Sequence, residues 1–287
     1  MEINMNIQWF PGHMAKTKRL IAENLKLVDI VVEILDARLP VSSKNADIDE
    51  LISQKPRIVV LNKADLADEA VNKKWASYFE RQGAGVLILD SLHAKNLNFV
   101  TAKIKEKLKD KIDKQKEKGM VGRSVKVMVV GIPNVGKSSF INKISKRTSA
   151  KTGDRPGVTR GKQWIRLDGG IELLDTPGIL PPKFTDKRAG LNLAFVGSVK
   201  DEILDTEELS MHLLEFLAEN YKEMLTNRYK LTDIEGLGGY DLLLAVGKKR
   251  GFIVSGGEID TERAASIVLD EFRGAKIGRI SLEKPEE

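Results

Sequence analysis

The 287-residue chain contains no cysteine, only three histidines and 6% aromatic residues. The lack of cysteine excludes a disulfide framework and cysteine-ligated zinc, and it is typical of a protein that works in a reducing compartment. No apolar run approaches the ~20 residues of a membrane-spanning helix, and the first residues lack the apolar core of a signal peptide. We therefore expect a cytoplasmic protein with no membrane partner.

The charge of the chain permits two interpretations. Lysine and arginine together number 47 against 41 acidic residues, which gives a formal net charge of +6. A positive balance permits a polyanionic partner such as RNA, but it is equally compatible with an ordinary solvated surface. With 41% hydrophobic residues there is enough apolar material for a core, and the length suits a larger domain and a smaller one.

A phosphate-binding loop is indicated at residues 131–138, which read G-I-P-N-V-G-K-S. A β-branched run at 125–130 precedes the loop, and apolar residues at helical spacing follow it, which is the context that this motif requires. Backbone N–H groups of such a loop point at phosphate oxygens, and the helix N-terminus adds its dipole. Lys137 is expected to reach the β- and γ-phosphates and Ser138 to ligate Mg²⁺. The predicted phosphate contacts are Asn134, Val135, Gly136, Lys137, Ser138 and Ser139.

Two further segments are expected to face the phosphates. Asp175-Thr176-Pro177-Gly178 begins where a predicted strand at 171–174 ends, and Asp168-Gly169-Gly170 predicts a hairpin between this strand and one at 164–167. Asp175 is expected to hold Mg²⁺ through water, and the Gly178 N–H to sense the γ-phosphate. Thr159, in the polar loop 146–162, is expected to be a switch threonine on Mg²⁺, with Thr148 and Thr152 as competitors.

The sequence N-K-A-D at residues 62–65 predicts recognition of guanine. The Asp65 carboxylate can accept hydrogen bonds from guanine N1–H and the 2-amino group, whereas ATP would leave this charge desolvated and unpaired. Asn62 is expected to bond the N7 side of the base and the Lys63 stem to pack against it. Ser91-Leu92 stands where a backbone N–H can meet the 6-oxo group.

The order of these motifs predicts a circular permutation. Strands at 28–36, 57–61 and 85–89 alternate with helices at 46–52 and 69–82, which predicts a parallel sheet covered on both faces. The guanine motif precedes the phosphate loop, although in ordinary GTPases it follows. The same sheet forms if the old termini are joined through the Lys-rich segment 101–126. This segment predicts an amphipathic helix whose basic face is either solvated or in contact with RNA.

These motifs in this order resemble the ribosome biogenesis GTPase A family of circularly permuted GTPases. The resemblance covers essentially the whole chain and includes Gln8-Trp9-Phe10-Pro11-Gly12-His13-Met14, Asp36-Ala37-Arg38 and Arg155–Thr159. It implies an α/β fold: a three-layer P-loop GTPase domain, circularly permuted, at 1–202, including an N-terminal extension at 1–22. A small α-helical RNA-binding domain follows at 203–287.

The resemblance also implies a function. It implies a GTPase that hydrolyses GTP to drive late assembly of the bacterial large (50S) ribosomal subunit and binds rRNA in a nucleotide-dependent way. We expect GTP and GDP, the large subunit and its rRNA as partners, no DNA, and a monomer off the ribosome. Turnover is expected to be slow alone and stimulated by the subunit and by K⁺.

Two residues bear on how such a site would work. Ile179 stands where many GTPases carry the Gln that orients the attacking water. His13 is our catalytic candidate in its place, beside Lys137, although it can equally shape a turn or contact RNA. In cation-dependent relatives an Asn at the position of Asn134 helps to bind K⁺, and the alternative is a backbone-positioning Asn.

Two alternative functions remain at this point. One is a nucleotide-gated RNA-binding assembly chaperone with little turnover, which Ile179 and the basic C-terminal region favour. The other is an ATP-using phosphotransferase, which Asp65 argues against.

Overall fold

The computed structural model describes residues 19–52, 54–93, 96–120, 122–149, 164–176, 187–199 and 205–286. By their internal contacts the described residues divide into two compact units. The first, called here the sheet unit, contains those between 19 and 176 together with 283–286. The second, called the helical unit, contains those between 187 and 282. Among the described residues, no helix combines the length and the apolarity needed to cross a membrane.

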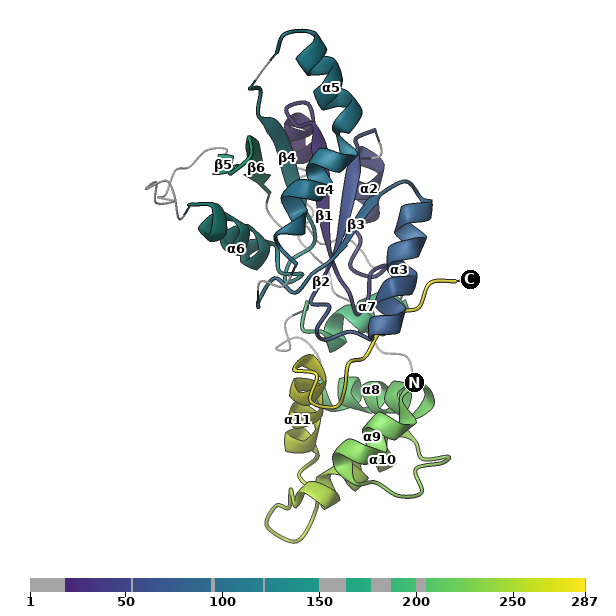
Figure 1. Cartoon of the computed structure of the whole chain (residues 1–287). Coiled ribbons are helices and arrows are strands. Elements are labelled where there is room, and N and C mark those ends of the chain that lie inside the picture. The colour runs from purple at the N-terminus through teal and green to yellow at the C-terminus, as the bar shows by residue number, and fades with distance from the viewer. Residues whose placement is uncertain are drawn as a thin grey trace. The chain divides into compact units, whose positions relative to one another are not determined.

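The sheet unit is built on a six-stranded sheet in the order β3-β2-β1-β4-β6-β5 (Figure 1). Its strands are β1 (Ile30–Asp36), β2 (Arg57–Asn62), β3 (Gly85–Ile88), β4 (Val125–Val130), β5 (Trp164–Leu167) and β6 (Ile171–Asp175). Neighbours pair in parallel except β5 and β6, which form the predicted antiparallel hairpin. Central pairing of β1 with β4 joins the two halves of the sequence, so the expected α/β fold and its permuted order are confirmed.

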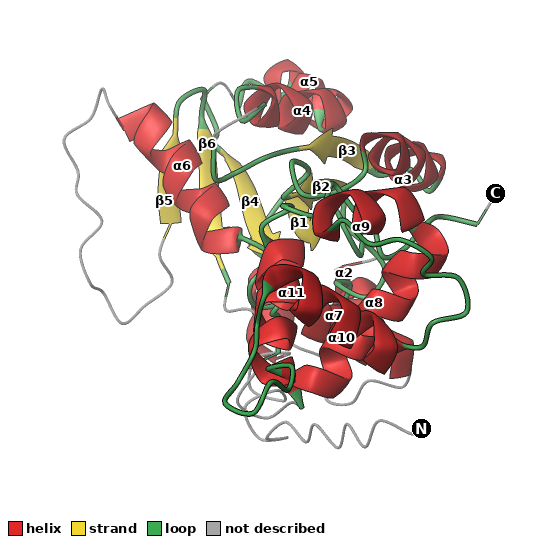
Figure 2. Cartoon of the chain, turned by 90° about the horizontal axis from the view of Figure 1, so that it is seen from below, coloured by secondary structure: helices red, strands yellow, loops and turns green. Residues whose placement is uncertain are grey.

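Helices lie against both faces of this sheet, because successive strand residues point to opposite sides. The helices of the unit are α2 (Ala46–Ile52), α3 (Glu69–Arg81), α4 (Phe99–Lys107), α5 (Lys109–Glu117) and α6 (Lys137–Ser149). Val31 packs in one apolar cluster with Ile52 of α2, and Leu35 packs in a second with Trp75 and Phe79 of α3. Val31 and Leu35 are four positions apart on β1 and share a face, so α2 and α3 cover the same side of the sheet. Figure 2 shows α4 and α5 together on one side of the yellow strands.

The Lys-rich segment forms two helices where the sequence predicts one. Leu108 has φ −106° and ψ 12°, which is outside helical geometry, and it separates α4 from α5. Val100 and Ile104 anchor α4 in the core, whereas α5 (K-D-K-I-D-K-Q-K-E) contributes no buried residue. Burial of α5 side chains therefore does not keep α5 in line with α4.

The helical unit consists of amphipathic helices whose apolar faces meet. They are α7 (Lys187–Phe195), α8 (Thr206–Asn220), α9 (Lys222–Tyr229), α10 (Gly239–Arg250) and α11 (Thr261–Arg273). Asp205 and Asp260 cap α8 and α11 by accepting backbone N–H bonds at the start of each helix. Gly239 lets α10 approach α8, because a Cβ there would lie 2.7 Å from the Met211 carbonyl oxygen.

Several basic side chains of the helical unit are occupied by intramolecular contacts. Glu271 pairs with Arg228 and with Arg250, and their attraction holds the pKa of Glu271 below its ordinary value although burial opposes this. Arg273 donates to the carbonyl oxygens of Phe195 and Ala194, the last residues of α7. These arginines therefore serve the fold, since a cation at a helix C-terminus satisfies its free carbonyls.

The C-terminal tail, residues 283–286, belongs to the sheet unit. The Glu283 carboxylate accepts hydrogen bonds from the backbone N–H of Val41 (2.7 Å) and of Ser42 (3.0 Å), and from the Ser42 hydroxyl. The indole N–H of the buried Trp75 donates to the Glu283 carbonyl oxygen at 3.1 Å. The tail thus fastens the loop that follows β1.

We predict that Glu283→Ala loosens this loop. The substitution removes the carboxylate that accepts hydrogen bonds from two backbone N–H groups, and this loss costs about 1–2 kcal/mol of local stability. The measurement is hydrogen exchange at the Val41 and Ser42 amides, which is expected to accelerate. Glu286→Ala, which removes an exposed carboxylate of the same tail, is the control. Equal exchange in both variants would contradict the fastening role.

Candidate nucleotide site

The predicted nucleotide motifs meet at one edge of the sheet, where its parallel strands end. In the strand register Asp36 lies beside Asn62, and Val129 lies beside Asp175. β4 leads directly into the phosphate loop, and β2 leads into the guanine motif. Because ligands of open α/β sheets bind beyond the carboxyl ends of the strands, this edge is the candidate site.

The phosphate loop has a backbone that only a few residue types tolerate. Gly131, Asn134 and Gly136 have φ values of 153°, 64° and 95°, all in the region that glycine adopts most readily. A Cβ on Gly131 would lie 2.6 Å from the Ile34 carbonyl oxygen of the neighbouring strand. The loop ends at Lys137, where α6 begins, so the helix N-terminus lies at the site as the sequence predicts.

Lys137 and Asp175 form the charged part of the site. Burial lowers the pKa of Lys137, and the opposite charge of Asp175 counteracts this. Desolvation raises the pKa of Asp175 while Lys137 opposes the shift. The Lys137 ammonium donates to the Ile132 carbonyl oxygen at 3.0 Å. A phosphate group and a cation would compensate both desolvated charges.

The donor set here fits Mg²⁺. Ser138 is exposed at the first turn of α6, and Asp175 ends β6 at the surface of the same edge. A hydroxyl and a carboxylate are the hard oxygen ligands that Mg²⁺ takes together with water and phosphate oxygens. The Thr176 hydroxyl donates to the Val129 carbonyl oxygen at 2.6 Å, which fixes the end of β6 against β4.

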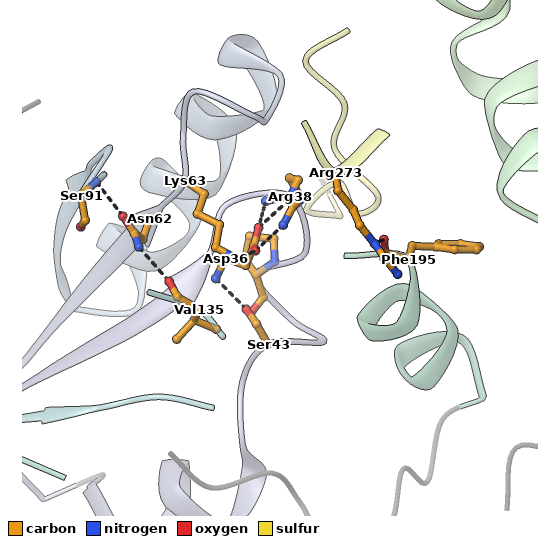
Figure 3. A network of polar contacts seen from close by, with 10 residues as sticks. Asp36, Arg38, Ser43, Asn62, Lys63, Ser91, Val135, Phe195 and Arg273 are labelled. Carbon is orange, nitrogen blue, oxygen red and sulfur yellow. Dashed lines mark hydrogen bonds and ion pairs between the residues drawn. The ribbon is translucent and has the colours of Figure 1, made fainter. Parts of the chain in front are cut away.

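Asn62 connects three segments of the site (Figure 3). Its side-chain N–H donates to the carbonyl oxygen of Val135 in the phosphate loop at 2.7 Å. Its side-chain oxygen accepts the backbone N–H of Ser91 at 3.0 Å. The amide therefore ties the guanine motif to the phosphate loop and to the loop after β3. This bridging role is additional to the contact with guanine N7 that the sequence suggests.

The loop after β3 lies close to the guanine motif. The Ser91 N–H is engaged by Asn62, so Leu92, whose side chain is exposed, carries the neighbouring candidate amide for the 6-oxo group. Asp90, almost fully buried, accepts the backbone N–H of His93 at 3.0 Å. His93 Nδ1 also lies 4.0 Å from Asp65 Oδ2, so this loop borders the carboxylate expected to read the base.

Asp36, Arg38 and Lys63 form a buried ion cluster that the sequence motifs do not predict. Asp36 is 1% exposed, and its carboxylate accepts hydrogen bonds from the Arg38 guanidinium at 3.0 and 2.8 Å. The Lys63 ammonium lies 2.9 Å from Asp36 Oδ2. A carboxylate at the carboxyl end of a buried strand was the available signal, since such ends are where functional groups gather.

Three predicted site residues, His13, Thr159 and Gly178, lie outside the described residues. Their roles stay predictions from the sequence. The described candidates that the fold brings to this edge are Asn62, Lys63, Asp65, Ser91, Leu92, Asn134, Val135, Gly136, Lys137, Ser138, Ser139 and Asp175.

Known proteins resemble this chain in both sequence and fold. A family model described as 50S ribosome-binding GTPase matches residues 126–235. The ribosome biogenesis GTPase A of Bacillus pumilus is 48% identical over 98% of this chain and 100% of its own length. The chain belongs to the ribosome biogenesis GTPase A family. Two solved structures, each 30% identical in sequence, resemble it. GDP-bound TM YlqF has a TM-score of 0.69, and the match covers 94% of this chain and 100% of that chain. GNP-bound YlqF from T. maritima has a TM-score of 0.65, and the match covers 95% of this chain and 99% of that chain.

Membership of this family assigns the activity. The chain is a GTPase of ribosome biogenesis, which binds guanine nucleotides and hydrolyses GTP with Mg²⁺. The family supplies the reaction, and the geometry of the sheet edge supplies candidates for the groups that perform it. Mg²⁺, when bound, would neutralise phosphate charge; Ser138 and Asp175 are the described candidates to hold it.

We predict that Gly136→Ala disrupts the site. A Cβ on Gly136 would lie 2.3 Å from the Asn62 side-chain nitrogen, so the Asn62 bridge must move. We expect GDP affinity to fall by about tenfold or more, measured by titration with fluorescent GDP. Gly83→Ala is the control, because Gly83 has φ +80° but nothing within 4 Å of its Cβ position. Gly83→Ala carries the backbone strain alone, and an equal loss of GDP affinity there would contradict the steric explanation.

Proposed function

We propose that this GTPase acts late in the assembly of the bacterial large ribosomal subunit, and that its helical unit binds rRNA in a way that depends on the bound nucleotide. The observation that carries the proposal is the permuted order of the chain. β6 ends at Asp175, and α7 of the helical unit begins at Lys187. The segment expected to respond to the γ-phosphate is therefore covalently continuous with the first helix of the helical unit.

The roles proposed at the nucleotide follow from the geometry of the sheet edge. Asp65 reads the guanine edge, and Lys137 with the N-terminus of α6 holds the phosphates. Asn62 keeps both halves of this site in register through Val135 and Ser91. A change at the phosphates would thus reach the base through Asn62 and the end of β6 through the opposite charges of Lys137 and Asp175. This gives the nucleotide a route to the segment that continues into α7.

The surface proposed for rRNA is the basic end of α10. Lys248 and Lys249 are exposed in its last turn, and Lys276 is exposed after α11. Arg250 and Arg273 are less suitable, because each makes the intramolecular contacts described above. Exposed lysines bind phosphates through charge, without sequence readout, and such binding weakens with salt. The proposal further takes the protein to be cytoplasmic and monomeric off the ribosome, which the lack of cysteine and the charged surface support.

The test is co-sedimentation of the full chain with large ribosomal subunits in the presence of a GTP analogue, GDP or no nucleotide. We expect most protein to pellet with the analogue and little with GDP. Lys248→Glu combined with Lys249→Glu is expected to lower pelleting by about tenfold or more at moderate salt, because each reversal removes a phosphate contact.

The matched control reverses Lys109 and Lys114, two exposed lysines of α5, with the same change in net charge. Pelleting that does not depend on the nucleotide would overturn the switch proposal. Loss of binding with the α5 variant alone would place the RNA contact on the Lys-rich segment instead.

We further propose that Asn134 supports a K⁺ ion beside the phosphates. Asn134 is exposed in the phosphate loop with φ 64°. A cation there would offset negative charge that develops between the β- and γ-phosphates. We expect GTP hydrolysis to be faster in K⁺ than in Na⁺ at equal ionic strength, by on the order of tenfold.

The matched variant is Asn134→Gly, because glycine keeps this backbone conformation without strain while removing the amide. The ratio of rates in K⁺ and Na⁺ is expected to fall towards one. Equal rates in the two salts for the unaltered protein would remove the proposed role of Asn134.

A further inference from the structure

The Asp36 carboxylate is held by two cations from different loops (Figure 3). The Arg38 guanidinium and the Arg38 backbone N–H both bond it from the loop that follows β1. The Lys63 ammonium reaches it at 2.9 Å from the guanine motif after β2. Arg38 and Asp36 are almost fully buried, with side chains 3% and 1% exposed, whereas the Lys63 side chain is 24% exposed. The cluster thus begins in the core and ends at the nucleotide edge.

The carboxylate in this cluster remains ionised. Burial by itself would raise the pKa of Asp36, but the charges of Arg38 and Lys63 hold it below its ordinary value. Arg38 alone supplies one compensating charge through two hydrogen bonds, so the second cation is not required for neutrality. Lys63 instead contributes an ion pair from a residue in the left-handed conformation, φ 58°, between Asn62 and Asp65. This arrangement requires an explanation beyond charge balance.

The position of Lys63 beside the proposed base site explains why a second cation contacts Asp36. A lysine side chain is long and flexible, and it loses rotamer freedom when it packs against a ligand. Here the ammonium is held by Asp36 within the protein, so the position of the four-carbon stem does not rely on a contact with the base. The loop that bears Arg38 is itself supported, since the Ser43 hydroxyl accepts the Asp36 N–H at 3.1 Å. The support therefore extends from the core to the proposed base site.

We propose that Asp36 is a positioning residue for the guanine base, which holds the Lys63 ammonium so that the Lys63 stem forms a preorganised wall of the base site. This role rests on the proposed recognition of guanine by residues 62–65. Asp36 touches no nucleotide itself, and its effect passes through Lys63. Asp36 should therefore affect the affinity for the guanine base, and it should not affect the rate of the chemical step at the phosphates.

The experiment is a double-mutant cycle on the full chain, with fluorescent GDP and Mg²⁺. Asp36→Asn and Lys63→Met each remove the ion pair, and the second retains an apolar stem. We expect each to weaken GDP binding by about tenfold and the combination to weaken it no further, because both remove one interaction. At saturating GTP the hydrolysis rate of Asp36→Asn is expected to stay within about twofold of the unaltered protein, with the loss confined to KM.

Glu33→Gln is the matched control. Glu33 is a buried carboxylate on the same strand, is paired with Arg57, and points to the opposite face of the sheet because it lies three residues from Asp36. We expect it to lower the melting temperature and to leave GDP affinity unchanged. A comparable loss of GDP affinity in Glu33→Gln would show that general destabilisation, not positioning, explains the effect.

Two results would overturn the proposal. Additive losses in the double variant would show that Asp36 does not act through Lys63. Unaltered GDP binding by Lys63→Met would show that the anchored ammonium is not needed, and this test holds even if Asp36→Asn does not fold. Asp65→Ala distinguishes failure of the proposed base site from failure of the role of Asp36. Unchanged GDP affinity in Asp65→Ala would refute the base site itself. Weaker GDP binding by Asp65→Ala together with normal binding by Asp36→Asn would refute only the role of Asp36.

Discussion

The side-chain amide of Asn62 is the contact on which the arrangement of the site depends. It bonds a carbonyl of the phosphate loop with one end and an amide of the loop after β3 with the other. These two loops are far apart in the chain, and the Asn62 side chain contacts both of them. Gly136 is required for the same reason, because a larger residue would occupy the space through which Asn62 reaches Val135. The sheet brings the loops to one edge, and Asn62 holds them in register.

The permuted order places this contact between the two halves of the sequence. Pairing of β1 with β4 restores a continuous parallel sheet although the guanine motif precedes the phosphate loop. The proposed switch depends on the end of β6, since the chain continues from there to α7 of the helical unit. The tail returns from that unit, and Glu283 bonds the loop after β1, which also carries Arg38.

Electrostatics at this edge separates into a structural part and a ligand-dependent part. Asp36 is compensated within the protein by Arg38 and Lys63, so its charge is stable without a ligand. Desolvation lowers the pKa of Lys137 and raises the pKa of Asp175, so it favours the neutral form of each group. A bound phosphate and a bound cation would reverse these shifts. In the proposed site, the first cluster preserves the shape of the base side, and the second responds to the nucleotide.

The sequence by itself determined the elements and the chemistry that depend on neighbours in the chain. The phosphate loop between strand and helix, the hairpin at 164–174 and the cap at Asp260 are local patterns, and each was predictable because hydrophobic period, glycine spacing and side-chain oxygens act over a few residues. Tertiary structure alone decided that Asp36 meets Lys63, that Asn62 spans two loops, and that Glu283 fastens residues 41–42. These contacts join residues 27 to 242 positions apart, whose encounter depends on strand register and on the path of the tail, which no local pattern encodes.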